Sequence, residues 1–232
     1  PSTSSAASDV YKRQTKHQSI QGSRFFSRGR LSYKNERIML SGKSLKKDLS
    51  DCGSDVWPAR IDCDFQKTAH GKTALVRLSH QGPLRIQKLF HDGDLAHCYL
   101  LHPPGGMVSG DSLQSRFRVH QGAKVLITTP ASGKLYQARK NQILQTARTH
   151  INITNDAFCA YLPQDTIVFD RAFGELESFL TVDSNATFIG WEHLIFGRRA
   201  GGYPFESGQL MQSLRIVREG RLLFRENLRL TP

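Results

Sequence analysis

The sequence predicts a mostly β domain, either layered or wound like a β-helix, with a few short helices. From Val56 onward, short runs of β-branched and aromatic residues recur at intervals of about 8–12 residues. Turn sequences rich in Gly, Asn and Asp separate these runs. So many strands need paired or covered edges, which favours a layered or helically wound sheet over one open sheet.

The expected strands follow one another to the end of the chain. They are residues 59–65, 73–81, 96–101, 113–120, 124–129, 146–154, 157–162, 166–170, 178–183, 209–219 and 221–230. Polar and apolar residues alternate in 148–153, the period of a strand with one wet face. Helical pattern is scarce: 133–144 predicts a helical turn or two, and 186–199 suits a helix ending at Gly197, although both also contain residues typical of strands.

Composition describes an ordinary globular protein. Of the 232 residues, 38% are hydrophobic and 22% are charged. Neither a membrane span nor the apolar core of a signal peptide is present in the sequence. The cysteines (Cys52, Cys63, Cys98 and Cys159) are widely spaced without a CxxC pair, so neither a zinc site nor a disulfide framework is indicated. We therefore expect a cytoplasmic protein with reduced thiols and no membrane partner.

The net charge of +12 is unevenly distributed. Residues 1–38 hold eight Lys/Arg and two Asp/Glu, which is half of the excess. Within them, 4–14 (SSAASDVYKRQ) matches an in-frame translation of a common sequencing-library adaptor. We expect 1–38 to be non-native or disordered, with Met39 as the true start. The alternative is a basic arm that binds RNA or an acidic partner.

The rest of the chain divides into two parts. Residues 39–55 are expected to be an N-terminal lead-in, and 56–232 a single β-rich domain. The chain stops at NLRLTP, directly after a hairpin-like pair, which predicts a domain truncated at its C-terminus.

A turn-rich loop, HPPGGMVSGD, spans residues 102–111. Its prolines fix φ and its glycines allow positive φ, so a tight and stiff loop is expected; they are Pro103, Pro104, Gly105, Gly106 and Gly110. His102 and Asp111 at its ends are ligand types for divalent metals such as nickel or zinc. Alternatively, Asp111 caps a turn and His102 only packs.

Two further segments could bind charged ligands. TTPASGKLYQ (128–137) offers a turn with Lys134 and Tyr136, which could seat an anion or simply connect two elements. YLPQDTIVFDRAFGELESF (161–179) concentrates carboxylates that could bind a cation or act in acid–base chemistry; they are Asp165, Asp170, Glu175 and Glu177. A solvated strand–turn–strand would show the same acidic composition.

GWEHLIFGRRAGG (190–202) combines aromatic and basic residues. Glu192 and His193 are adjacent, so they point in different directions and make a weak metal pair. Trp191 and Arg198 are residue types favoured as interface anchors, so this segment predicts an interaction surface.

Six segments, in this order and with unbroken spacing, resemble the urease accessory protein family UreD, also called UreH. They are GPLRIQKLF, LLHPPGGMVSGDSL, GAKVLITTPASGKLYQ, YLPQDTIVFDRAFGE, GWEHLIFGR and FESGQL. The resemblance covers about residues 57–230. It implies a mostly β, β-helix-like fold with an internal tunnel proposed to guide nickel. It also implies a non-enzymatic scaffold that binds urease apoprotein and the accessory proteins UreF and UreG, the latter a GTPase that delivers nickel.

In that context the candidate residues acquire roles. Transient nickel ligands would be His102, Asp111, Asp165, Asp170 and Glu175, with no stably bound cofactor. Partner-binding residues would be Pro103, Pro104, Gly105, Gly106, Lys134, Tyr136, Trp191, Glu192 and Arg198. The family usually has Glu at the position of Asp165 and often Trp at that of Tyr161, so the ligand role of Asp165 depends on a shorter side chain.

Two other functional classes stay open. One is a β-rich hydrolase or lyase that uses Asp165, Asp170 or His102 as acid–base groups, although neither GxSxG nor HExxH occurs. The other is a nucleic-acid-binding module, although the sequence after residue 38 lacks a basic stripe with interleaved aromatics, so no nucleic-acid partner is expected.

Overall fold

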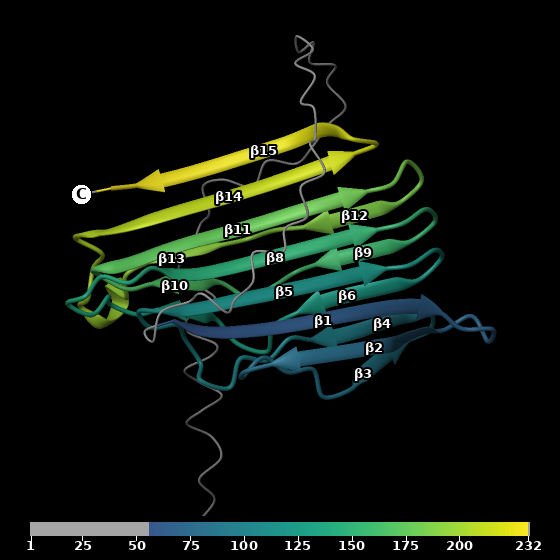
Figure 1. The fold of residues 1–232 in the computed structure, drawn as a ribbon, viewed down its shortest axis with the longest axis horizontal. Coiled ribbons are helices and arrows are strands. Elements are labelled where there is room, and N and C mark those ends of the chain that lie inside the picture. The colour runs from purple at the N-terminus through teal and green to yellow at the C-terminus, as the bar shows by residue number, and fades with distance from the viewer. Residues whose placement is uncertain (1–55, 232) are drawn as a thin grey trace, which may run out of the picture. The chain divides into compact units, whose positions relative to one another are not determined.

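The chain winds into a stack of β coils, seen in a computed structural model that describes residues 56–231 (Figure 1). Its strands form sheets of seven, five and three strands. The mostly β prediction is therefore confirmed. The expectations for residues 1–38 and 39–55 lie outside the described residues.

The seven-stranded sheet forms one side of the stack, in the order β15-β14-β11-β8-β5-β1-β2. Its strands are β1 (Trp57–Lys67), β2 (Thr73–Gln81), β5 (Asp111–Val119), β8 (Gln145–Ile153), β11 (Ala172–Val182), β14 (Gly208–Arg218) and β15 (Arg221–Leu230). The pairs from β1 through β5, β8 and β11 to β14 are parallel, whereas β2 and β15 close the two edges antiparallel.

Two shorter sheets complete the coils. The five-stranded sheet, in the order β12-β9-β6-β4-β3, contains β3 (Leu89–Asp92), β4 (Leu95–Tyr99), β6 (Lys124–Thr128), β9 (Phe158–Tyr161) and β12 (Thr187–Gly190). The three-stranded sheet, in the order β13-β10-β7, contains β7 (Gly133–Leu135), β10 (Thr166–Val168) and β13 (Leu194–Phe196).

Each coil visits the three sheets in turn. The runs β5-β6-β7, β8-β9-β10 and β11-β12-β13 each contribute one strand to every sheet, and equivalent strands pair in parallel with their neighbours. This is the winding of a β-helix. Its consequence is that inward side chains of successive coils stack in rows across the sheet.

Both helical expectations are wrong. Residues 133–144 begin with β7 and continue as an irregular loop, and 186–199 contain β12 and β13. In the described part of the chain, the one helical segment is a 3-10 turn at Arg199–Gly201. Pairing with β9 and β10 of the preceding coil supplies the hydrogen bonds of 186–199, so the coil register overrides a weak local helical pattern.

Two apolar clusters fill the stack. The larger lies between the seven- and five-stranded sheets and includes Phe65, Phe117 and Ile127. The smaller lies at the three-stranded sheet, around Leu135 and Leu210. Together they bury the inward faces of the strands, which is the main stabilising contribution to such a fold.

The three described cysteines are free and buried; they are Cys63, Cys98 and Cys159. Burial raises the pKa of each thiol, to about 12 for Cys98, so they remain protonated at neutral pH. They act as small apolar core residues. Within residues 56–231, no helix has the length and apolar character needed to cross a membrane.

Candidate functional site

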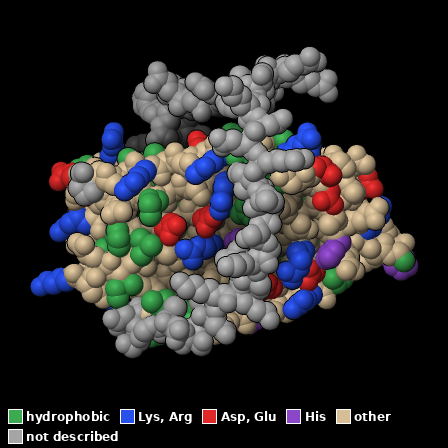
Figure 2. All heavy atoms as spheres, turned by 45° about the horizontal axis from the view of Figure 1, so that its top comes forward, with side chains coloured by type: hydrophobic (Ala, Val, Ile, Leu, Met, Phe, Trp, Pro, Cys, Tyr) green, Lys and Arg blue, Asp and Glu red, His purple; other side chains and the backbone are tan. Residues whose placement is uncertain are grey.

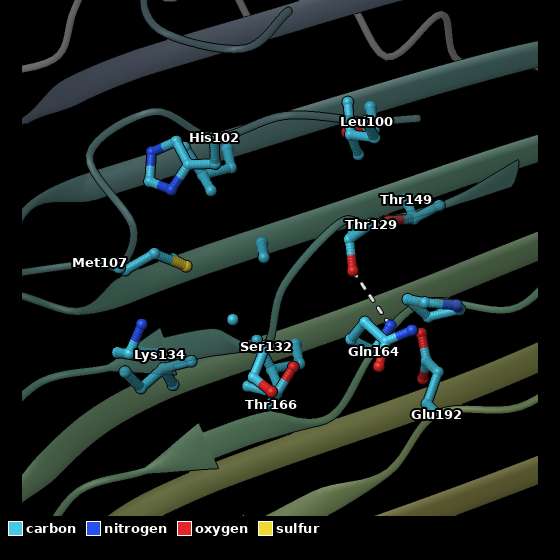
Figure 3. Close-up of a pocket in the computed structure, with 18 of the residues that line it drawn as sticks. Leu100, His102, Met107, Thr129, Ser132, Lys134, Thr149, Gln164, Thr166 and Glu192 are labelled. Atoms are coloured by element: carbon cyan, nitrogen blue, oxygen red, sulfur yellow. Dashed lines mark hydrogen bonds between the residues drawn. The ribbon is translucent and has the colours of Figure 1, made fainter. Parts of the chain in front are cut away.

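A cavity of about 250 Å³ lies inside the stack (Figure 3). Its wall includes inward residues of four strands of the seven-stranded sheet and the connections between the two shorter sheets. A first coil, made of β1, β4 and the loop 102–110, precedes the three already described. Every coil contributes to the wall, from His102 in the first to Glu192 in the last. The cavity therefore extends across successive coils.

Small polar side chains create this space. Ser115 in β5, Thr149 in β8 and Ser178 in β11 pair in register, and all three line the cavity. The next inward row is bulky and apolar and consists of Phe117, Ile151 and Leu180. The interior thus changes from solid core to cavity within two residues of each strand.

Glu192 supplies a half-buried carboxylate to the cavity. It accepts hydrogen bonds from Ser178 Oγ and from Gln212 Nε2, the latter at 3.0 Å. Burial raises the pKa of Glu192, while these two hydrogen bonds oppose the rise and the charge of Glu226 adds to it. A carboxyl in this setting can accept a proton or a cation from the cavity.

His102 lies in the first coil, on the other side of the pocket from Glu192 in Figure 3. Burial lowers the pKa of its imidazole, and the charge of Asp111 opposes that effect. A neutral imidazole is the form that coordinates metals. The Asp111 carboxylate accepts a hydrogen bond from the Val108 amide at 2.8 Å. It therefore caps a turn, which is the alternative to metal binding that the sequence offered.

The loop 102–110 takes the place of a strand of the three-stranded sheet in the first coil. Met107 bridges to Leu135: its amide donates to the Lys134 carbonyl at 2.7 Å, and the Tyr136 amide donates to the Met107 carbonyl at 3.0 Å. Lys134 Nζ also donates to the Gly105 carbonyl at 3.3 Å. The loop is therefore a fixed wall of the cavity.

Gly106 is required where the loop meets its support. A Cβ at this position would lie 2.4 Å from the Tyr136 ring and 2.9 Å from Lys134 Cβ. Tyr136 in turn packs against Phe169, with ring centroids 5.0 Å apart. Lys134 and Tyr136, predicted to bind partners, thus support the loop from inside, whereas Pro103, Pro104 and Gly105 are exposed.

The other three predicted metal ligands are not among the residues that line the cavity. Asp165 faces His193 on the surface, with 3.5 Å between Oδ1 and Nδ1. Asp170 accepts hydrogen bonds from the Glu206 and Ser207 amides, which hold its pKa below the usual range. The structure therefore brings none of them together with His102.

The fifth candidate, Glu175, lies on the outer face of the seven-stranded sheet. It pairs there with Arg148 at 3.4 Å. Outward and inward residues alternate in β11, so Glu175 is directed away from the cavity that Leu176 and Ser178 line.

Trp191 and Arg198 are exposed near the last coil. The Trp191 ring is 44% exposed and stacks on His193 with a centroid separation of 5.7 Å. The Arg198 guanidinium lies 4.7 Å from the centroid of Tyr203. Both positions remain accessible to a partner, as the sequence prediction for them requires.

Glu192 is the residue whose position the sequence prediction missed, since it was assigned to a partner surface. A period-two interpretation of 188–196 would have placed it inside, because Trp191 and His193 are exposed on either side of it. In residues 56–231, no group of three or more His, Cys, Asp or Glu is arranged to hold a metal ion. His102 and Glu192 are separate donors along the cavity wall.

Comparisons with known proteins all indicate the same family. The sequence model of a family described as UreD urease accessory protein matches residues 58–232. A urease accessory protein UreD from Marinomonas sp. is 43% identical over 182 residues, which cover 78% of this chain and 58% of that protein. One from Saccharophagus degradans is 42% identical over 173 residues, covering 73% and 58%. The chain thus spans about 58% of the length of these relatives.

Proposed function

Because the chain belongs to the UreD urease accessory protein family, we propose that it acts in urease maturation as a scaffold for nickel insertion. In this proposal it binds urease apoprotein together with UreF-like and UreG-like proteins, in the cytoplasm. Nickel is cargo that moves through the protein rather than a resident cofactor. The chain itself catalyses no reaction.

The observation that carries this proposal is the cavity that extends across successive coils. Its wall includes His102 at one end and Glu192, with His193 next to it, at the other. Imidazole and carboxylate ligands suit nickel, and donors used one or two at a time release a metal more readily than a closed thiolate site. The cavity is thus suited to passing a divalent cation on.

Each donor has a defined role in such a transfer. The neutral imidazole of His102 presents a lone pair without first losing a proton. The Glu192 carboxyl is held by Ser178 and Gln212, and an approaching cation would favour its ionised form. Tyr161, whose pKa burial raises, stays neutral beside it.

The hydrolase alternative is weaker, because its three acid–base groups are not assembled. His102 lines the cavity, whereas Asp170 holds the 206–207 backbone and Asp165, which does not line the cavity, pairs with His193. General acid–base catalysis needs these groups within reach of one substrate.

The test is co-expression of the full chain with urease structural subunits and UreF-like and UreG-like proteins. Glu192→Gln keeps the shape of the side chain but removes its charge. We expect urease that copurifies normally but contains severalfold less nickel and has correspondingly lower activity. Asp165→Asn, outside the wall, is the matched control and should activate urease like wild type.

Two outcomes would contradict the proposal. Failure of the wild-type chain to capture any of these proteins would remove the scaffold role. Full nickel loading with Glu192→Gln would remove the role of the cavity carboxylate.

A further inference from the structure

The outer face of the seven-stranded sheet, opposite the cavity, is rich in arginine. Strand register and alternation place eight arginines there: Arg60, Arg77, Arg116, Arg118, Arg148, Arg215, Arg225 and Arg229. The same register places four carboxylates on it: Asp62, Asp64, Glu175 and Glu177. Eight cations against four anions give this face, which we call the arginine face, an excess of four positive charges.

Carboxylates fix five of these arginines in place. Arg60 pairs with Asp62 at 2.6 Å, and Arg118 pairs with Asp64. Asp64 also lies 4.0 Å from Arg77. Figure 2 shows positive and negative side chains interspersed on the molecular surface. Such pairs hold each guanidinium in a defined orientation while leaving part of it accessible.

The second group of pairs is centred on Glu177. Its carboxylate contacts Arg148, at 3.4 Å, and Arg215. In contrast, no ion pair within residues 56–231 involves the remaining arginines: Arg116, Arg225 and Arg229. Arg225 and Arg229 are exposed on β15. These three guanidiniums account for most of the uncompensated charge.

One row in the middle of the arginine face combines charge with aromatic surface. It runs in register through Arg116, His150, Phe179, Arg215 and Arg225. The His150 and Phe179 rings meet edge-on at 5.9 Å, and the Arg215 guanidinium lies 5.4 Å from the Phe179 centroid. An aromatic centre flanked by arginines is the composition of an interface hot spot.

We propose that the arginine face docks a carboxylate-rich surface of a protein partner. This inference rests on the proposed function, since the partner would be a member of the urease maturation assembly. Planar guanidiniums bind carboxylates in a bidentate way, which suits fixed arginines better than mobile lysines. The excess of positive charge is complementary to an acidic surface and would steer its approach.

A protein partner fits this face better than a nucleic acid does. The four carboxylates lie among the arginines, so a continuous phosphate backbone would meet repulsion as well as attraction. A folded protein surface can instead match the pattern charge by charge.

The test reverses charge at the two exposed arginines without an ion pair, in the whole chain. Arg225→Glu with Arg229→Glu leaves the five ion-paired arginines of the face unchanged. We expect capture of the co-expressed urease maturation proteins to fall about tenfold, and wild-type capture to weaken as salt is raised. The control, Arg139→Glu with Lys140→Glu in the loop between β7 and β8, changes the charge equally and should capture like wild type.

A milder double variant, Arg225→Gln with Arg229→Gln, is the control for misfolding. It should show an intermediate loss of capture at an unchanged melting temperature. If the wild type and both double variants of Arg225 and Arg229 captured the maturation proteins equally, the docking face would be overturned. The proposed function would be unaffected by that result. Capture by the wild type that nuclease abolishes would identify a nucleic acid and overturn the inference. No capture by the wild type would overturn the proposed function and this inference with it.

Discussion

Two parts of the interior, formed by the same strands, differ sharply. In β11, Leu180 is fully buried in the large core, whereas Leu176, four residues earlier on the same inward face, lines the cavity. Between them Ser178 bonds Glu192. Both residues lie in one strand, so the difference comes from what surrounds them: apolar side chains around Leu180, and small polar ones beside Leu176. The β-helix provides the wall, and small polar rows leave the space.

The greatest loss of stability is expected from a substitution in the filled part of the interior. Leu180→Ala should lower the free energy of unfolding by about 3 kcal/mol, because it leaves a void in a close-packed core. Leu176→Ala, in the same strand and on the same face, should cost about 1 kcal/mol because its side chain already borders empty space. Urea denaturation of the two variants measures the difference. Equal losses would mean that the cavity is filled by rearrangement of the interior.

The next effect concerns the loop that forms the cavity wall. Gly106→Ala should lower stability by about 2 kcal/mol, since its Cβ would overlap the Tyr136 ring. Gly105→Ala meets no atom but has φ of +77°, so it should cost about 1 kcal/mol through backbone strain. Thermal unfolding compares them. The reverse order would show that the loop yields more easily than its hydrogen bonds suggest.

Stability should depend on pH through Glu192. Burial raises the pKa of Glu192 in the folded protein, so folding favours the protonated form. The contribution of Glu192 to stability therefore falls as the pH rises above 4.5, the ordinary pKa of a glutamate side chain. Glu192→Gln removes that dependence. The stability of the variant relative to wild type should therefore increase between acidic and neutral pH, as measured by denaturation at several pH values. A constant difference would contradict a raised pKa.

The smallest effect on stability comes from filling the cavity. Ser115→Leu adds apolar volume beside an existing space, so its unfolding free energy should stay within about 1 kcal/mol of wild type. Urease activation should nevertheless fall, because the added side chain obstructs the passage. Ser115→Ala is the matched control and should activate normally. Normal urease activation by the Ser115→Leu variant would show that activation does not need an open cavity.

The sequence indicated the fold more reliably than the site. Alternation in 148–153 and the recurring turns located most strands, because side-chain period and turn chemistry are local properties. The short strands 89–92, 133–135, 187–190 and 194–196 were missed. The last three are held by parallel pairing with a neighbouring coil, so the hydrogen bonds that define them come from residues far away in the sequence.

Among the candidate residues, His102 was placed correctly at a stiff loop, because Pro and Gly restrict the backbone wherever they occur. Three carboxylates are close in sequence, yet each has a different partner: His193 for Asp165, the Ser207 amide for Asp170 and Arg148 for Glu175. Clustering in sequence could not predict this, since consecutive coil segments turn their side chains toward different sides of the stack.

The many short strands and the rigid loop at 102–111 could be inferred from the amino-acid sequence, and its motifs identified the family. That Ser115, Thr149 and Ser178 meet in one row, with Glu192 facing them, is evident only in the folded protein. Each of these side chains is an ordinary polar residue within its own strand. The cavity exists because the register between coils aligns them, and that register is set by hydrogen bonds and packing between residues about 30 positions apart.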